Sequence, residues 1–426
     1  MFRLALAGLL VALIALPAST CPFCGSQGQT LGGEIGVADF IILGKPTNPR
    51  PDKDDFTRGT TDVVIEKVVK GHPYLTGKKI IRINKLLPID PADKNPSHLL
   101  VFSTVENKPA TSAATAAAGT LVLGNLFDNP IDAYRGVEVS ANSRLADYMK
   151  GAITVREKDT PARLKYFFDY LDAAELEINS DAFMEFGNAD YADVRQLAGD
   201  LSREKIFSWL KDPSTPSSRL GFYGLLAGHC GKKEDAATLR QLLDDPTRRF
   251  ASGLDGLMAG YILLDPKGGW EYLTAIIQDQ KKQEFATQHA AVKVLRFFWD
   301  SRSDVISKDH IVDGAKLAMQ NGDFADFAIE DLRKWQRFEL TELVLKTSQL
   351  DTHKKEPMVK RAVLKFMLAA SAKNPKAAEF VTAARADNPD KVKEYEEILE
   401  QERKTALEAA ASKPTASAKK KPSGGN

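Results

Sequence analysis

The chain has few cysteines, with only Cys21, Cys24 and Cys230 among 426 residues. So few cannot form the several cross-links that stabilise small disulfide-rich secreted domains, so a protein of this length must be stabilised by packing. An excess of one charge is also missing, because 58 lysines and arginines face 57 aspartates and glutamates. This balance provides no overall attraction to nucleic acid or membrane, and we predict no nucleic-acid partner.

Motifs for common catalytic and metal sites are missing as well. The sequence has no His-Glu-x-x-His, no Gly-x-Ser-x-Gly and no glycine-rich phosphate loop. Its six histidines are scattered without the spacing of zinc ligands. His229 and Cys230 are neighbours, but adjacent helical side chains point about 100° apart and do not form a nucleophile–base pair. We therefore predict a non-enzyme with no catalytic residues, metal or cofactor, in which Cys230 is a small buried side chain.

The only long apolar run is Leu4–Leu16, which follows the positively charged Arg3. Small residues then lead to Cys21, as in a secretory signal peptide, and the run is too short for an ordinary membrane-spanning helix. We predict that residues 1–20 are a signal peptide. The mature protein would be exported to a periplasm, an envelope or the outside, with no transmembrane segment. A buried N-terminal helix or an uncleaved anchor is a less favoured alternative. A lipoprotein modified at Cys21 is less favoured too, because Ala-Ser-Thr precedes the cysteine where lipoprotein signals favour leucine at the first of these positions and glycine or alanine at the last.

Residues 21–140 have a β pattern, with short apolar or β-branched segments separated by glycine and proline breaks. Five or six short strands without an intervening helix are typical of a small barrel or sandwich. We predict an OB-like all-β barrel. The candidate strands are Asp39–Leu43, Thr60–Lys70, Lys79–Lys85, His98–Val105 and Thr120–Leu123.

From Thr160 onward the apolar period is 3.6, with Thr160 as a candidate N-cap and Pro161 at the first helical position. We predict a linker at 141–160, an all-α HEAT- or armadillo-like superhelix at 161–411, and a disordered Lys/Ala/Pro tail at 412–426. Candidate inner helices start 38, 32, 35, 39 and 35 residues apart, near Asp181, Arg219, Ala251, Ala286, Ala325 and Lys360.

Asp-Pro turns between these helices resemble the inter-repeat turns of HEAT-like arrays. They occur at Asp212-Pro213, Asp245-Pro246 and Asp265-Pro266. The resemblance covers about residues 160–399. It implies an extended binding surface without specifying a partner.

One helical sequence pattern occurs twice within Arg219–Leu264. Its glycines are spaced by three and then four residues, so each trio is expected to lie on one stripe of a helix. A glycine inside a helix costs roughly 0.8–1 kcal/mol relative to alanine, which calls for a compensating contact. We predict that another backbone packs closely against each stripe. The first trio is Gly221, Gly224 and Gly228, and the second is Gly253, Gly256 and Gly260.

Cys21-Pro22-Phe23-Cys24 resembles a glutaredoxin active-site sequence. Such a site follows a buried strand and opens a helix, which lowers the pKa of the first thiol. Here the motif follows a signal-like segment and precedes Gly25, so it also lacks the histidine of a c-type haem attachment. We favour a local disulfide or structural clamp, with a thiol–disulfide oxidoreductase using Cys21 and Cys24 as an alternative.

The same cysteines and the first strands resemble the netrin-like domain of tissue inhibitors of metalloproteinases. The likeness covers about residues 21–123 and rests on the cysteine-led start, Ala38–Gly44 and Val63–Gly71. It implies a five-stranded OB-type barrel. It also implies that the amine and carbonyl of Cys21 could coordinate a protease zinc after signal cleavage. The family has Cys-x-Cys and distant cysteine partners, whereas this chain has Cys-x-x-Cys.

Together these patterns predict an exported α+β protein of two domains that binds partners without chemistry. Its helical-repeat surface would contact a protein or envelope partner. The basic residues Lys419, Lys420 and Lys421 could add weak envelope contact, although a solvated tail is the simpler interpretation. The alternatives are a metalloprotease inhibitor acting through Cys21 and the oxidoreductase described above.

Overall fold

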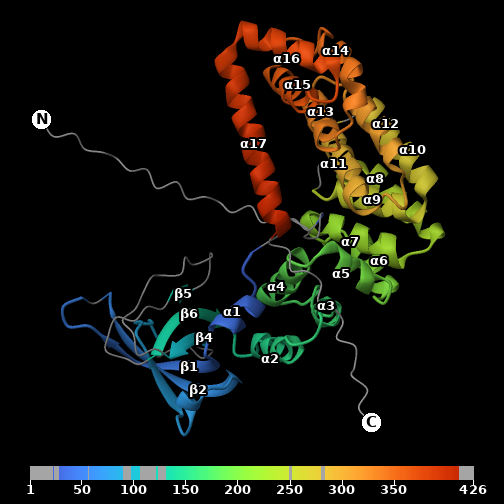
Figure 1. Ribbon diagram of the computed structural model, residues 1–426. Helices are drawn as coiled ribbons and strands as arrows, with labels where there is room; N and C mark the ends of the chain where they lie inside the picture. Colours follow the sequence, from blue (N-terminus) through green and yellow to red (C-terminus); the bar gives the residue numbers. More distant parts are fainter. Residues whose placement is uncertain are drawn as a thin grey trace, which may run out of the picture. The chain divides into compact units, whose positions relative to one another are not determined.

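A computed structural model describes residues 23, 28–55, 57–89, 97–105, 121–122, 131–248, 252–279 and 284–411 (Figure 1). The chain divides into two compact units between Glu204 and Lys205. Residues 1–20, Cys21, Cys24 and the tail with Lys419, Lys420 and Lys421 lie outside the described residues. No helix in the described part is long and apolar enough to cross a membrane.

The first unit contains one antiparallel sheet of six strands in the order β3-β2-β1-β4-β6-β5. The predicted barrel is not closed among the described strands, because β3 and β5 are the two ends of this order. These end strands have only four and two residues, so they offer little backbone for mutual pairing. The strands are β1 (Phe40–Pro51), β2 (Gly59–Lys70), β3 (Ile80–Ile83), β4 (His98–Val105), β5 (Leu121–Val122) and β6 (Ile131–Val139).

Both faces of the central strands are covered, which explains their continuous apolar runs. Phe40 and Ile42 on β1 belong to an apolar cluster on one face of the sheet. Ile41 points to the opposite face by the alternation of a strand, pairs in register with Phe102 on β4, and is fully buried. Helices of the same unit pack against β2 and β4.

Among the described residues, five α-helices accompany the sheet, so this unit is not all-β. The region predicted as a linker contains α2, whose Tyr148 side chain is buried. The predicted cap at Thr160 is one residue late, because the Asp159 side chain accepts the Ala162 N–H at 3.0 Å. The helices are α1 (Leu31–Val37), α2 (Leu145–Val155), α3 (Thr160–Phe168), α4 (Leu176–Gly187) and α5 (Tyr191–Ala198).

The second unit is helical throughout its described residues and alternates between inner and outer helices (Figure 1). Each inner helix packs against the next inner helix: α7, α9, α11, α13, α15 and α17. The prediction that a small β region is followed by helices is confirmed. The helices are α6 (Arg203–Lys211), α7 (Ser217–Cys230), α8 (Ala236–Asp244), α9 (Leu254–Leu264), α10 (Pro266–Gln278), α11 (Phe285–Ser301), α12 (Lys308–Ala318), α13 (Ala325–Lys334), α14 (Thr341–Ser348), α15 (Pro357–Ala370), α16 (Pro375–Asp387) and α17 (Pro389–Ala411).

The α7 and α9 helices meet along their glycines. A Cβ added to Gly256 would lie 2.0 Å from the carbonyl oxygen of Gly221, and one added to Gly260 would lie 2.0 Å from that of Gly224. At Gly228 it would lie 2.7 Å from the Cα of Gly260. Contacts therefore advance in the same direction along both helices, which run parallel.

Gly253 has a different role from the other glycines of its trio. It lies at the N-cap of α9 with φ at +97°, in the left-handed region that favours glycine. An added Cβ there would also lie 2.4 Å from the amide nitrogen of Gly221. Gly253 thus combines a close backbone approach with the turn that begins α9.

Candidate functional site

A series of ion pairs joins successive inner helices of the second unit. The paired residues are separated in sequence by 38, 35, 35 and 37 positions. These separations are close to one helical repeat, so each pair links an inner helix to the next inner helix. The ladder consists of Asp255 with Lys293, Arg296 with Asp331, Glu330 with Lys365, and Lys365 with Glu402.

Several charges of this ladder are shielded from water. Lys365 and Asp331 are each 4% exposed. Burial raises the pKa of Asp331 to about 6, although Arg296 opposes the shift through two contacts of 2.8 Å. For Glu402, burial acts in the opposite sense to Lys365 and Arg333, and the net effect lowers its pKa. Buried charges of this kind are tolerated when paired and hydrogen-bonded.

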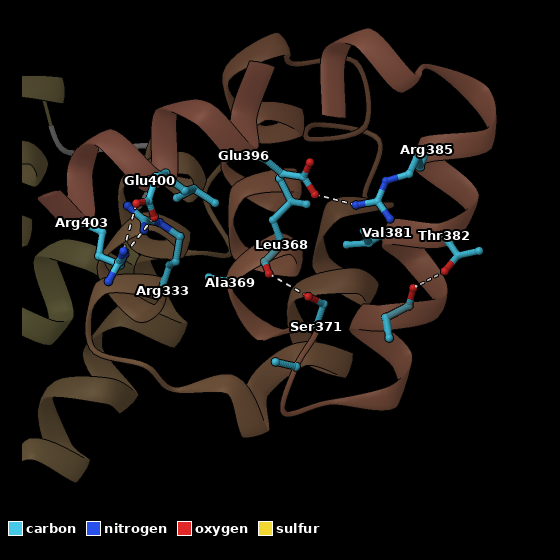
Figure 2. Close-up of a pocket in the computed structure, with 13 residues that line it drawn as sticks. Arg333, Leu368, Ala369, Ser371, Val381, Thr382, Arg385, Glu396, Glu400 and Arg403 are labelled. Carbon is cyan, nitrogen blue, oxygen red and sulfur yellow. Dashed lines mark hydrogen bonds and ion pairs between the residues drawn. The ribbon is translucent and has the colours of Figure 1, made fainter. Parts of the chain in front are cut away.

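At the α17 end of the ladder, a groove of about 600 Å³ lies among α13, α15, α16 and α17 (Figure 2). This volume is in the range of ligand-binding clefts. Its lining combines apolar side chains with arginines and glutamates: Arg333, Leu368, Ala369, Ser371, Ala372, Ala378, Val381, Thr382, Arg385, Glu396, Leu399, Glu400 and Arg403.

Small side chains create the hollow. Ala369 and Ala372 lie where α15 ends, and Ala378 lies near the start of α16, so little side-chain volume fills the space below α17. Two hydroxyls in the wall already bond to helix carbonyls. Ser371 donates to the Leu368 carbonyl and Thr382 to the Ala378 carbonyl, each at 2.9 Å (Figure 2). Apolar side chains such as Leu368 and Val381 therefore lie beside hydroxyls whose hydrogen bonds are already made.

The rim of the groove carries two exposed ion pairs. Arg385 contacts Glu396 at 2.5 Å, and Arg403 contacts Glu400 at 2.9 Å (Figure 2). The two arginine side chains are 53% and 65% exposed. Such surface pairs contribute only about 0–1 kcal/mol, so an anion from a ligand can replace the glutamate at small cost.

Arg333 differs from the two rim arginines because ion pairs hold its largely buried side chain in place. Its side chain is 10% exposed and contacts both Glu330 and Glu402, the latter at 2.7 Å. It joins the floor of the groove to the ion-pair ladder, so the groove has one fixed arginine and two that can change partner.

A second cluster of perturbed groups lies in the first unit. The Tyr148 hydroxyl donates to Asp181 at 2.6 Å, and burial raises the pKa of Asp181 to about 7. Burial is also the main cause of the strongly raised pKa of Tyr148. The two residues are 1% and 2% exposed, so a substrate has no direct access to either. Perturbed pKa values alone do not make this pair a catalytic site.

The residues singled out in the sequence do not line the groove. Cys21 and Cys24 lie outside the described residues. Cys230 is half-buried at the end of α7, not fully buried as predicted. Within the described chain, no group of three or more histidine, cysteine or acidic residues could hold a metal ion. The arginines of the groove belong to no recognisable sequence motif. The ladder could have been inferred from oppositely charged residues that lie 35 to 38 positions apart in the sequence.

Comparison with protein families, with curated proteins and with solved structures finds no match for this chain. Its proposed function therefore rests on its own residues and their geometry.

Proposed function

We propose that this protein is a non-catalytic binding protein that holds a segment of a protein partner on the inner surface of its helical unit. The groove among α13, α15, α16 and α17 is the proposed contact point. The observation that carries the proposal is the combination of apolar side chains in the groove wall with the two exchangeable arginines, Arg385 and Arg403. Helical arrays commonly present extended surfaces to partners.

The chemistry of the groove favours a peptide with a carboxylate beside small apolar side chains. A guanidinium offers a planar fork of donors that matches a carboxylate. Ala372 and Val381 in the wall offer contact to small apolar groups rather than further hydrogen bonds. The glutamates of the rim disfavour a highly charged anion, because displaced Glu396 and Glu400 would remain close to it.

Peptide binding tests this proposal directly. A panel of peptides that combine aspartate or glutamate with alanine or valine would be titrated in low salt, beside the corresponding asparagine and glutamine peptides. We expect acidic peptides to bind, amide peptides to bind at least about tenfold more weakly, and added salt to reduce affinity.

The arginine variants locate the binding. Arg385→Ala combined with Arg403→Ala should reduce affinity for the acidic peptides about tenfold or more. Lys354→Ala is the matched control, because Lys354 is also an exposed member of an i,i+3 ion pair, with Asp351, but does not line the groove. Equal binding by the double variant and by wild type would refute the proposed site.

The finer assignments belong to the same proposal. A HEAT- or armadillo-like identity for the array is supported by the ladder spacing of 35 to 38 residues. Export, the OB-type identity of the sheet unit and its netrin-like resemblance rest on the sequence pattern. Sequencing the mature N-terminus would test export, since cleavage before Cys21 is the expected result.

A further inference from the structure

A second cavity lies in the helical unit, lined by α8, α9, α10 and the start of α11. Its volume is about 270 Å³, and the described residues that line it are all different from those of the groove. Because liquid water occupies about 30 Å³ per molecule, the cavity has room for a ligand of up to about nine non-hydrogen atoms.

One end of this cavity is polar, and its own side chains already satisfy it. Arg240 Nε donates to Asp244 at 2.6 Å, and the guanidinium also bonds to the Tyr261 hydroxyl. The guanidinium carbon lies 4.2 Å from the centre of the Tyr272 ring, and the Tyr272 hydroxyl bonds to Asp244. The two charges at this end compensate each other, so a charged ligand group gains little there.

The other end of the cavity holds a carboxylate without a counter-charge. Asp279 is the C-cap of α10, about two turns after Tyr272, which corresponds to about 10 Å along the helix axis. Within the part of the chain that the structure describes, no hydrogen bond or ion pair engages the Asp279 carboxylate. Its backbone is fixed, because the buried Gln288 side chain donates to the Asp279 carbonyl at 3.2 Å.

A hydroxyl and an apolar wall accompany this carboxylate. Thr287 precedes Gln288 in the first turn of α11 and lines the same cavity. Ile276 lies between Tyr272 and Asp279 on α10, and the wall from α9 is formed by Leu254 and Met258. The three apolar side chains are buried, so this wall offers the cavity a hydrocarbon surface.

We propose that this cavity binds a primary ammonium group on an unbranched aliphatic stem, with the ammonium at Asp279 and Thr287 and the stem against the apolar wall. An ammonium group has three donors, which a carboxylate and a hydroxyl oxygen accept. The stem gains free energy by leaving water for the hydrocarbon surface. A ligand carboxylate is disfavoured, because it would bring a second negative charge to Asp279 while Asp244 already compensates Arg240.

The same chemical group occurs in a free aliphatic amine and in the lysine side chain of a protein partner. The cavity shares no described lining residue with the groove, so this binding does not depend on the function proposed for the groove.

Titration of the full chain with n-pentylamine at pH 7 in low salt tests the proposal by NMR of isotope-labelled methionine methyl groups. The Met258 methyl signal should shift as the amine is added, because Met258 lines the cavity. Met358 is the internal control, since it is exposed on α15 and lies outside the cavity. n-Pentanol and pentanoate should bind at least about tenfold more weakly, because neither brings a positive charge to Asp279.

Two variants locate the ammonium. Asp279→Asn should weaken pentylamine binding about tenfold and leave the weak binding of pentanol unchanged, which distinguishes a lost charge from a lost fold. Thr287→Val keeps the shape of the side chain, removes the hydroxyl and should weaken amine binding about threefold. Glu271→Gln is the matched control, because Glu271 is an exposed acid of α10 that does not line the cavity.

A capped lysine, Nα-acetyl-lysine methylamide, identifies the source of the group. Binding as tight as that of pentylamine supports a lysine of a protein partner, whereas binding of pentylamine alone supports a free amine. The proposal is overturned if neither ligand shifts the Met258 signal, if pentanol binds as tightly as pentylamine, or if Asp279→Asn binds the amine as wild type does.

Discussion

Lys365 shows how much of the helical unit depends on single buried charges. Its ammonium lies between the carboxylates of Glu330 and Glu402, and its side chain is 5% exposed. A buried cation is stable only while its partners remain in place. One residue on α15 thereby connects the preceding inner helix, α13, with the following inner helix, α17.

Replacing Lys365 by methionine keeps most of the side-chain volume and removes the charge. We expect a loss of about 3 kcal/mol in the free energy of unfolding, because Glu330 and Glu402 each lose a paired cation and must share Arg333. Urea denaturation measures the change. Lys354→Ala should change stability by less than about 0.5 kcal/mol, because its ion pair is exposed. If both variants are as stable as wild type, the buried pairing contributes nothing.

Among the helices, α7 and α9 show what sequence reasoning can reach. Their glycine spacing was visible because three- and four-residue intervals are local properties of a helix, and the geometry places those glycines against the neighbouring backbone. Gly253 could not be separated from the others by spacing, since its cap position depends on where α9 begins.

The contact between α7 and α9 makes a sharp prediction for Gly256→Ala. Even one methyl group would meet the Gly221 carbonyl oxygen, so we expect destabilisation of about 1–3 kcal/mol in thermal or urea unfolding. Gly199→Ala is the matched control, because an added Cβ there meets nothing within 4 Å. The control should be neutral or slightly stabilising. Equal stability of the two variants would show that the helices separate at little cost.

Elements held by distant residues were harder to predict. The α1 helix has three glycines in seven residues, which is a weak helix sequence, and it was not predicted. It is stabilised by the Thr30 cap and by Asp181, which lies 150 positions away from Leu31. The β6 strand is likewise absent from the strands predicted from the sequence, although it pairs along β4. In both cases the residues that stabilise the element are far away in the sequence, so the local pattern does not reveal them.

At the scale of the whole molecule, the order of sheet and helices was predictable and the groove was not. The change of apolar period near Thr160 reports a local property of the chain. The groove requires residues from four helices, and Arg333 and Arg403 are 70 positions apart in sequence, since 403 − 333 = 70. Such a site forms only when the repeats stack, so the sequence alone does not reveal it.

The stacking of repeats also predicts which helices of the second unit are destabilised when its last helix is removed. Ending the chain after Asp387 removes α17 and with it Glu402, so Lys365 and Arg333 lose a partner. We expect faster hydrogen exchange in α15 and α16, with α7 and α9 protected as before, because repeats depend chiefly on their neighbours. Leu407→Ala, at an exposed position of α17, should leave all four helices unchanged. Uniform loss of protection would contradict a repeat-by-repeat architecture.

The contact between Leu31 and Asp181 also sets an order of events in time. A ribosome makes the N-terminus first and must deliver about 150 further positions before α4 can accept this amide. Closing such a long loop carries an entropic cost that only the later residues can offset. The early segment therefore waits unbound while the sheet is being made.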